Sequence, residues 1–408
     1  MSVRARSLVA AAVPGAVLPL AAAHLVVDGY ANIYAPLLPL LIPRLGLSLA
    51  AAGVLAMAFQ LAASVSQLGF GRLADRWRPR ALLMVGPIVT VGVLSLVGVA
   101  GSALTLGAVL VVGGLGCAAF HPPAAVAAHQ MGGDRPGYAM SVYITGGTLG
   151  FSMGPLVFAP FAERFGLAWT PAVAIPGLLA LALVLRRAPR IAIDPESRRG
   201  GLRTLRPYAR PLALLYAVVV LRTLTTLSLA TFVPVLLTER GLSVAEAGSA
   251  FAVYLLTSGV GGFLGGPAAD RFGPRRVIIL SLLAAAPFLI VAPLLDPAWF
   301  MVVLAAGGFF LLSTLPVNVT FGQMLAPVSA GTVSSLMMGV AWGTGGLAMP
   351  VVGLIADRIG IESTLMWLGA VPILAALCAW PLPARAHAAG TARPTPRGAE
   401  PIPGDVVR

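Results

Sequence analysis

The sequence contains no lysine, and charged residues of every kind are scarce. Only 10% of the 408 residues are charged, whereas a soluble domain carries about 25%. Hydrophobic residues make up 58% of the chain, and the mean hydropathy is +0.92. Apolar runs extend from residue 13 to residue 381. This pattern excludes a soluble protein, with or without a single anchor, and predicts an integral membrane protein.

Cysteine is almost absent, and so are the motifs of enzymes and pumps. Cys117 and Cys378 both fall in apolar runs, so neither a disulfide nor a metal site is expected. No Gly-Lys-Ser/Thr loop is present to hold ATP phosphates, and no His, Cys and Glu residues have metal-ligand spacing. We therefore expect no catalytic residues, no cofactor and no metal.

What the sequence does have is a succession of apolar segments that are each long enough to cross a bilayer, about 20 residues. Glycine and proline are abundant, with 47 and 34 residues. Membrane helices tolerate both, and glycine permits close helix packing. The expected spans are 14–42, 48–72, 81–101, 104–130, 137–162, 168–186, 210–238, 245–268, 276–295, 298–326, 330–356 and 362–382.

The arginines predict how these spans are oriented. The net charge is +13, which in a soluble protein would suggest nucleic acid, but here the basic residues lie between the apolar runs. With both termini in the cytoplasm, the outside loops hold only Arg44, Arg164, Arg240 and Arg358, and Arg222 lies inside a span. The other 22 of the 27 arginines then face inward, as positive-inside topology requires.

The longest polar break divides the spans six and six. We expect an N-terminal six-helix bundle over 1–186, a basic cytoplasmic linker over 187–209 and a C-terminal six-helix bundle over 210–382. The segment 383–408 is rich in proline, alanine, glycine and arginine, which predicts a disordered cytoplasmic tail.

The two halves also resemble each other in sequence. "GRLADRWRPR" follows the second span and "GPAADRFGPRR" follows the eighth, which places Asp75 and Asp270 195 residues apart. Glu163 ends the fifth span and Asp357 ends the eleventh, 194 residues apart. Parallel repeats of six helices are typical of secondary transporters, which bind substrate between the halves near the membrane midplane.

The motif Gly71-Arg72-Leu73-Ala74-Asp75-Arg76 resembles the signature loop of the major facilitator superfamily, with a degenerate copy that includes Asp270 and Arg271. The resemblance implies the twelve-helix, all-α fold of that superfamily. It also implies gating roles for Gly71, Asp75, Arg76, Asp270 and Arg271, which would hold the cytoplasmic ends of the halves together. A positive-inside turn without a gating role is the alternative.

A narrower resemblance covers most of the first half. "HLVVDGYANIYAPLLPLL", "FQLAASVSQLGFGRLADR", "AAFHPPAAVAAHQMGG" and "GGTLGFSMGPL" are similar to the fosmidomycin resistance protein family of exporters. This chain has Pro123 where that family usually has Glu. Gly150, Gly154 and Pro155 resemble a motif of exporting antiporters in the fifth span, which implies a kinkable, closely packed helix with a gating role.

The first span contains a stripe of polar residues. His24, Asp28 and Asn32 are spaced by four residues, which places them on one helix face. Asp28 is the only acidic residue expected at membrane depth, where a carboxylate costs about 2.5–3.5 kcal/mol on insertion scales. We expect Asp28, with His24 and His121, to couple transport to protons. Hydrogen bonding of Asp28 to a neighbouring helix, or simple packing of His121, are the alternatives.

Arg222 is the cationic counterpart in the seventh span. It is expected either to pair with Asp28 or to bind an anionic substrate. Polar and aromatic residues elsewhere in the spans are candidate substrate contacts, although interhelical hydrogen bonds would explain several of them equally well. These are Asn32, Tyr30, Tyr34, Gln60, Tyr143, Thr226, Tyr254, Asn318 and Trp342.

Together these features predict a proton-driven exporter of small amphipathic or anionic compounds, monomeric in the cytoplasmic membrane, that works by alternating access. Its partners would be a small-molecule substrate, protons and the lipid bilayer, with no nucleic acid. Asp28 would release its proton inward and reload from outside. An importer or uniporter on the same fold, or a membrane sensor that does not transport, are the alternatives.

Overall fold

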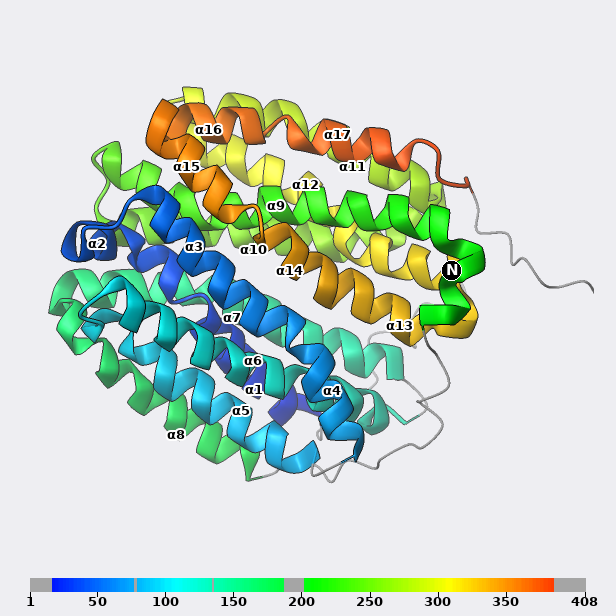
Figure 1. Ribbon diagram of the computed structural model, residues 1–408, viewed down its shortest axis with the longest axis horizontal. Coiled ribbons are helices and arrows are strands. Elements are labelled where there is room, and N and C mark those ends of the chain that lie inside the picture. Colours follow the sequence, from blue (N-terminus) through cyan, green and yellow to red (C-terminus); the bar gives the residue numbers. More distant parts are fainter. Residues whose placement is uncertain (1–16, 77–78, 134–135, 187–201, 385–408) are drawn as a thin grey trace, which may run out of the picture.

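The computed structural model describes residues 17–76, 79–133, 136–186 and 202–384. Within these residues, six membrane-long helical segments form the first half of the molecule, which lies in the lower part of Figure 1. Their helices are α1 (Val17–Ala31) with α2 (Tyr34–Leu45), α3 (Leu49–Gln60) with α4 (Gln67–Arg76), α5 (Pro79–Leu94), α6 (Ala103–Met131), α7 (Pro136–Phe165) and α8 (Ala174–Leu185).

The second half repeats this plan above the first, with six more membrane-long segments among the described residues (Figure 1). Its helices are α9 (Ala209–Glu239), α10 (Val244–Phe272), α11 (Pro274–Val291), α12 (Pro297–Leu325), α13 (Ala330–Ser335) with α14 (Ala341–Gly346) and α15 (Met349–Ile359), and α16 (Ile361–Leu368) with α17 (Val371–Ala379). The predicted all-α fold with twelve transmembrane helices in two halves is confirmed.

The linker and the tail fall mostly outside the described residues. Of the predicted linker 187–209, the structure describes only the end, where Leu202–Tyr208 forms a 3-10 helix that leads into α9. Nearly all of the predicted tail, from residue 385 onward, and residues 1–16 also lie outside.

The first span is broken where the sequence predicted one helix over 14–42. α1 ends at Ala31, and α2 begins at Tyr34. Pro36 explains the break, because proline has no N–H to donate to the carbonyl of Asn32, and its ring would clash with that carbonyl in a continuous helix. Asn32 therefore lies in the turn between the two helices rather than on the helical face that the four-residue spacing predicted.

The two halves are in contact at one end of the molecule. There α3 packs on α15, and α7 packs on α10. Glycine makes the first crossing close: a Cβ at Gly53 would lie 2.3 Å from the carbonyl oxygen of Met349, and one at Gly353 would lie 2.2 Å from that of Leu49. We call this end, where the loop 46–48 joins the first two spans, the closed end.

The halves separate at the opposite end of the same four spans. There, neither α4 nor α13, which continue the second and eleventh spans, packs extensively against a described helix of the other half. Two π-helical segments, Leu61–Val65 and Leu336–Val340, lie on the second and eleventh spans between the closed and the open end.

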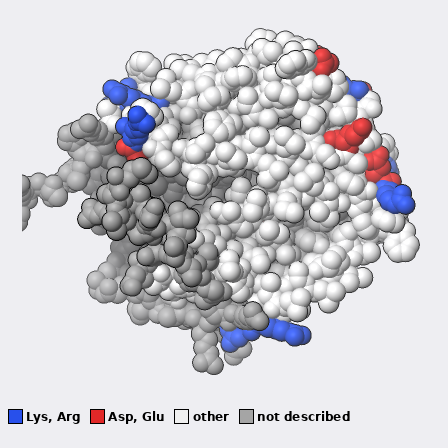
Figure 2. Space-filling view, turned by 180° about the vertical axis from the view of Figure 1, so that it is seen from behind, with Lys and Arg blue, Asp and Glu red and all other residues white. Residues whose placement is uncertain are grey.

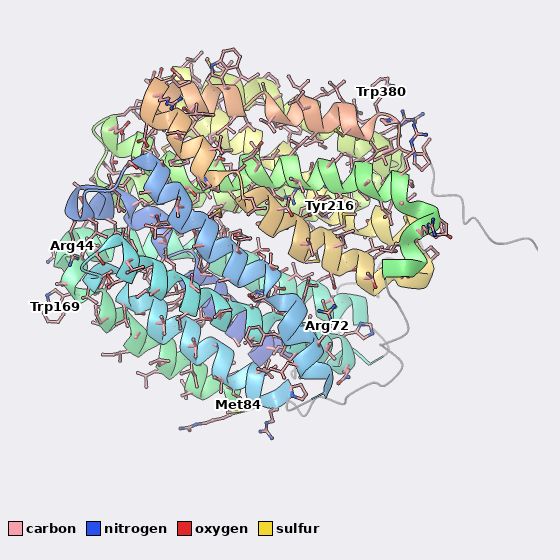
Figure 3. The ribbon with its side chains drawn as sticks, in the orientation of Figure 1. Arg44, Arg72, Met84, Trp169, Tyr216 and Trp380 are labelled. Atoms are coloured by element: carbon pink, nitrogen blue, oxygen red, sulfur yellow. The ribbon has the colours of Figure 1, made fainter. Side chains whose placement is uncertain are left out.

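The molecular surface agrees with a membrane setting. In Figure 2 the visible charged side chains lie at the right edge and along the left and lower margins, with a broad uncharged band between them. Figure 3 shows Arg44 and Trp169 at the closed end and Arg72 toward the opposite end. An uncharged band of this kind is what a surface in contact with lipid hydrocarbon requires.

Candidate functional site

Asp28 lies between two histidines in the first half. Its Oδ2 atom lies 3.1 Å from Nε2 of His24, one turn earlier on α1, and its Oδ1 atom lies 3.2 Å from Nε2 of His121 on α6. The structure thus brings together all three residues that the sequence suggested for proton coupling. We call them the His–Asp–His cluster. Its ring-nitrogen and carboxylate atoms all lie within 4.8 Å of one another, and hydrogen bonds explain both contact distances.

The other nitrogen of each imidazole is held by a backbone carbonyl. Nδ1 of His24 lies 2.8 Å from the carbonyl oxygen of Tyr143, and Nδ1 of His121 lies 2.7 Å from that of Cys117. A carbonyl oxygen only accepts hydrogen bonds, so both Nδ1 atoms carry a proton. The Nε2 atoms that face Asp28 are therefore the positions at which the ring protonation can change.

The helix α7 crosses directly over this cluster. The ring of Tyr143 stacks on the ring of His24 with centroids 4.1 Å apart. A Cβ at Gly147 would lie 2.4 Å from the His24 ring and 2.7 Å from Asp28 Oδ2. Any larger residue there would push the His24 ring and the Asp28 carboxylate out of their observed positions, so Gly147 belongs to the site although the sequence gave no reason to single it out.

The second half contributes a buried cation, Arg222 on α9. Arg222 is only 1% exposed. Nη2 donates to Thr223 Oγ1 at 3.1 Å, and the guanidinium lies 5.3 Å from the ring centroid of Trp342, a cation–π contact. Nε and Nη1 have no hydrogen-bond partner among the described residues. A buried guanidinium with free donors is costly to maintain and is suited to binding an anion.

Asp28 and Arg222 occupy equivalent places in the repeat. They are 194 residues apart, the same separation as Glu163 and Asp357. The first half therefore presents a carboxylate where the second presents a guanidinium. This correspondence could have been found from the sequence by extending the repeat to the first and seventh spans.

Further buried polar atoms lie on neighbouring spans. The hydroxyl groups of Tyr143 and Tyr254 and both amide atoms of Asn318 have no hydrogen-bond partner among the described residues. Tyr254 interacts electrostatically with Arg222. Buried polar groups are normally paired. Tyr143, Tyr254 and Asn318, like Arg222, therefore have polar atoms that remain available to a polar ligand.

Other predicted contacts are already used within the protein. The Tyr30 hydroxyl donates to the carbonyl of Val173, that of Tyr34 donates to Ala52 at 3.1 Å, and Asn32 donates to Phe151 at 2.8 Å. All three join helices of the first half, so the structure places them in packing rather than beside the cluster. Their sequence spacing around Asp28 did not reveal this, because the helix breaks at Asn32.

Gln60 and Thr226 are intermediate cases. Gln60 donates to Ser64 at 2.5 Å and packs near Gly346, at the contact between the second and eleventh spans. The Thr226 hydroxyl donates to the carbonyl of Arg222 at 3.0 Å, within its own helix. Neither side chain reaches the His–Asp–His cluster in the contacts that the structure shows.

The predicted gating residues divide between two places. Gly71, Asp270 and Arg271 lie near the open end, and Asp270 and Arg271 are exposed. The backbone of Asp75 and Arg76 ends α4, but their side chains lie outside the described part of the chain. Gly150, Gly154 and Pro155 lie instead within α7, where the two glycines pack against the α1 backbone; a Cβ at Gly150 would lie 2.0 Å from the Leu25 carbonyl oxygen.

Two acidic residues connect the halves at the closed end. Asp357 accepts hydrogen bonds from the backbone N–H groups of Leu49 and Ala50, at 2.8 and 2.9 Å, at the start of α3. Glu163 accepts one from Ala245, at 2.6 Å, at the start of α10. These were the repeat-related pair in the sequence, but the sequence did not indicate what they bind.

Both contacts place a carboxylate at a helix N-terminus of the other half. The first N–H groups of a helix have no partner within it, and its dipole favours a negative charge there. Ser48 already accepts from Ala51 in α3, and Ser243 accepts from Glu246 in α10, so the carboxylates complete the two caps. We call this symmetric arrangement the closed-end latch.

Removing one carboxylate of the latch should favour opening. Asp357→Ala should shift the population away from the closed-end contact by about 0.3–1 kcal/mol, the usual value of a carboxylate at a helix N-terminus. Spin labels at Gly101→Cys and Ala298→Cys, with Cys117 and Cys378 replaced, would report longer distances. Glu362→Ala is the matched control, because Glu362 pairs with Arg240 of its own half. Equal distance distributions for Asp357→Ala and the parent would contradict the latch.

The fold and the site together define a class of protein: a membrane transporter of two parallel six-helix halves, with ionisable groups buried between helices. The model for the Major Facilitator Superfamily matches residues 20–242 and 214–404, and the chain belongs to that family. It is 31% identical to an uncharacterised transporter of this type, YfnC from Bacillus subtilis, over 87% of this chain and 89% of the relative.

Two further comparisons, one with a relative and one with a solved structure, agree with this family and its fold. The chain is 29% identical to the fosmidomycin resistance protein of Escherichia coli, again over 87% of this chain and 89% of that protein. The family resemblance stated from the sequence is therefore confirmed. Its fold matches a crystal structure of a bacterial homologue of the human lysosomal transporter Spinster with a TM-score of 0.76, 19% identity and coverage of 89% and 95% of the two chains.

Proposed function

We propose that this protein is a proton-driven antiporter that exports small anionic or amphipathic compounds by alternating access. The observation that carries the proposal is the pair of ionisable sites at equivalent places in the two halves, one partly buried and one fully buried. The His–Asp–His cluster provides a place for protons, and Arg222, two of whose nitrogens lack a hydrogen-bond partner in the described part of the chain, provides one for an anion. The similarity to a fosmidomycin resistance protein supports export.

The arginine distribution supports a location in the cytoplasmic membrane, as a monomer, with both termini in the cytoplasm. In that orientation the open end faces inward and the closed end faces outward. Substrate would enter from the cytoplasm and bind near Arg222, Tyr254, Asn318 and Trp342. The halves would then rock, breaking the closed-end latch and closing the ends near Asp75 and Asp270.

Transport in inverted membrane vesicles tests the direction and the coupling. A thermal-stabilisation screen of the purified protein selects the probe from fosmidomycin, phenylphosphonate and its neutral diethyl ester. If the protein is an exporter, the probe selected in the screen should accumulate inside the vesicles when respiration acidifies the lumen. An uncoupler should abolish this accumulation. Accumulation that ignores the uncoupler would contradict proton coupling, and vesicles without the protein set the background.

One observation favours a second candidate, a symporter of protons and anions. The cluster carries more positive charge when protonated, and an anion bound at Arg222 in the other half would be attracted to that state rather than repelled. Electrostatics alone would then load proton and anion together. In the same vesicles a symporter should accumulate the probe only when the outside is the acidic side, which distinguishes it from the antiporter by the sign of the gradient.

A further inference from the structure

We propose that the exchangeable proton of the cluster is carried on Nε2 of His121, while Asp28 stays ionised as its counter-ion and His24 stays protonated as a fixed partner. This assignment rests on the proton coupling proposed above and narrows it to one atom. It differs from the sequence-based expectation that Asp28 itself releases the proton.

The hydrogen-bond pattern fixes how many protons the observed cluster holds. Both Nδ1 atoms already donate to backbone carbonyls. If the carboxylate and both Nε2 atoms were bare, lone pairs would face each other at 3.1 and 3.2 Å. Each contact therefore contains one proton, so the cluster holds two. With both on the more basic imidazoles, its net charge is +1.

The net charge of the cluster after each proton is lost limits how many of the two protons can leave. Loss of one proton to water leaves one imidazolium beside the carboxylate, a neutral ion pair. Loss of the second would leave a carboxylate alone at membrane depth, which costs about 2.5–3.5 kcal/mol on insertion scales. The cluster should therefore cycle between +1 and 0 and exchange one proton, while Asp28 remains ionised throughout.

The surroundings of the two rings decide which of them exchanges. The His24 side chain is only 8% exposed, is stacked on Tyr143 and lies against α7 at Gly147, whereas that of His121 is 25% exposed. The ring that loses its Nε2 proton is left with a lone pair facing the Asp28 carboxylate, so it needs a water molecule that can donate a hydrogen bond to it, and the more exposed His121 ring is the one that water can reach. His121 is also followed by two prolines, which free backbone carbonyls of α6 and allow local adjustment of the helix.

The other groups that face the cluster do not compete for this proton. Cys117 on α6 lies within reach of Thr90 on α5, at 3.6 Å from its hydroxyl oxygen, and Tyr143 lies on α7. In a buried site, thiol and phenol groups remain neutral because burial disfavours their charged forms. The step is therefore a single transfer. The Nε2–H bond of His121 breaks, the proton goes to water, and the electron pair of that bond stays on Nε2.

Nuclear magnetic resonance of the purified protein tests the assignment without a substrate. The protein is labelled with 15N-histidine and 13C-aspartate, and His24→Gln, His121→Gln and Asp28→Asn assign the three signals by difference. As pH rises, His121 should be the ring of the cluster that first loses its Nε2 proton, while His24 stays protonated and the Asp28 carboxyl stays ionised. The four histidines of the chain make assignment by elimination feasible even if one variant fails to fold.

Every other result overturns the proposal. Titration of the Asp28 carboxyl with both rings unchanged would make Asp28 the carrier, and earlier loss of the His24 proton would reverse the roles of the histidines. Simultaneous loss from both rings would indicate a two-proton site.

A transport measurement separates this assignment from the proposed function. His121→Gln should lower gradient-driven accumulation at least tenfold yet leave probe exchange at equal pH within about twofold of the parent, a pattern of lost coupling with retained binding. His24→Gln, the matched control, should lower both together because it misplaces Asp28. A parent protein that ignores the proton gradient would refute the proposed function, while the magnetic resonance result would still decide which atom titrates.

Discussion

Asp28→Asn should reduce proton-driven transport to the level of vesicles that lack the protein. Asparagine is nearly isosteric with aspartate and carries no charge, so an imidazolium at His121 would lose its counter-ion at membrane depth, where an unpaired charge is costly. His121 would then stay neutral, and the proton cycle would stop. Uptake of the selected probe into inverted vesicles measures the effect.

Folding is expected to survive this substitution. Asparagine is cheaper to bury than a carboxylate, and its amide nitrogen can donate to one of the two Nε2 atoms that now face Asp28. The thermal unfolding midpoint should therefore stay equal or rise, and Glu362→Gln, an acid outside the site, serves as the matched control. Undiminished proton-driven transport by a folded Asp28→Asn protein would remove the cluster from the mechanism.

Replacing Arg222 should separate binding from stability. The guanidinium is buried with two nitrogens unpartnered among the described residues, so Arg222→Met should raise the unfolding midpoint by removing a desolvated charge. The same substitution should weaken phenylphosphonate roughly 10- to 100-fold, because a hydrogen bond to a charged group contributes about 1.5–3 kcal/mol. The neutral diethyl ester should bind as before.

Arg222→Lys refines this test. Lysine keeps the charge but loses the planar arrangement of donors, so it should restore part of the phosphonate affinity and none of the stability gain. A lower midpoint for Arg222→Met, with equal losses for the anion and its ester, would show that Arg222 supports structure. Titration calorimetry and thermal unfolding of the same preparations give both quantities.

The membrane architecture was predictable because long apolar segments have few alternatives. Hydropathy located all twelve spans to within several residues, and the acidic residues at matching ends of the spans indicated two equivalent halves. Asp28 and His121 were also predictable as isolated ionisable residues in apolar surroundings. Their contact was not predictable, because nothing in the sequence shows that α6 brings His121 beside the Asp28 carboxylate.

The contacts that the sequence did not predict are mostly those that involve the backbone. Gly147 admits the cluster beside α7, and the carboxylates of Glu163 and Asp357 bind N–H groups, which every non-proline residue has. Tyr30 and Tyr34 turned out to bind backbone carbonyls of neighbouring helices. Periodicity identifies a helix face but not a backbone partner, so these roles required the structure.

The closed-end latch has a consequence for how this protein can change over evolution. Each of its bonds joins a specific acidic side chain in one half to an anonymous backbone group in the other. Almost any residue could therefore replace Leu49, Ala50 or Ala245 without losing the bond, proline excepted. We therefore expect the positions that donate the N–H groups, in both halves, to tolerate a change of side chain, whereas replacing Glu163 or Asp357 by a residue without a carboxylate loses the bond.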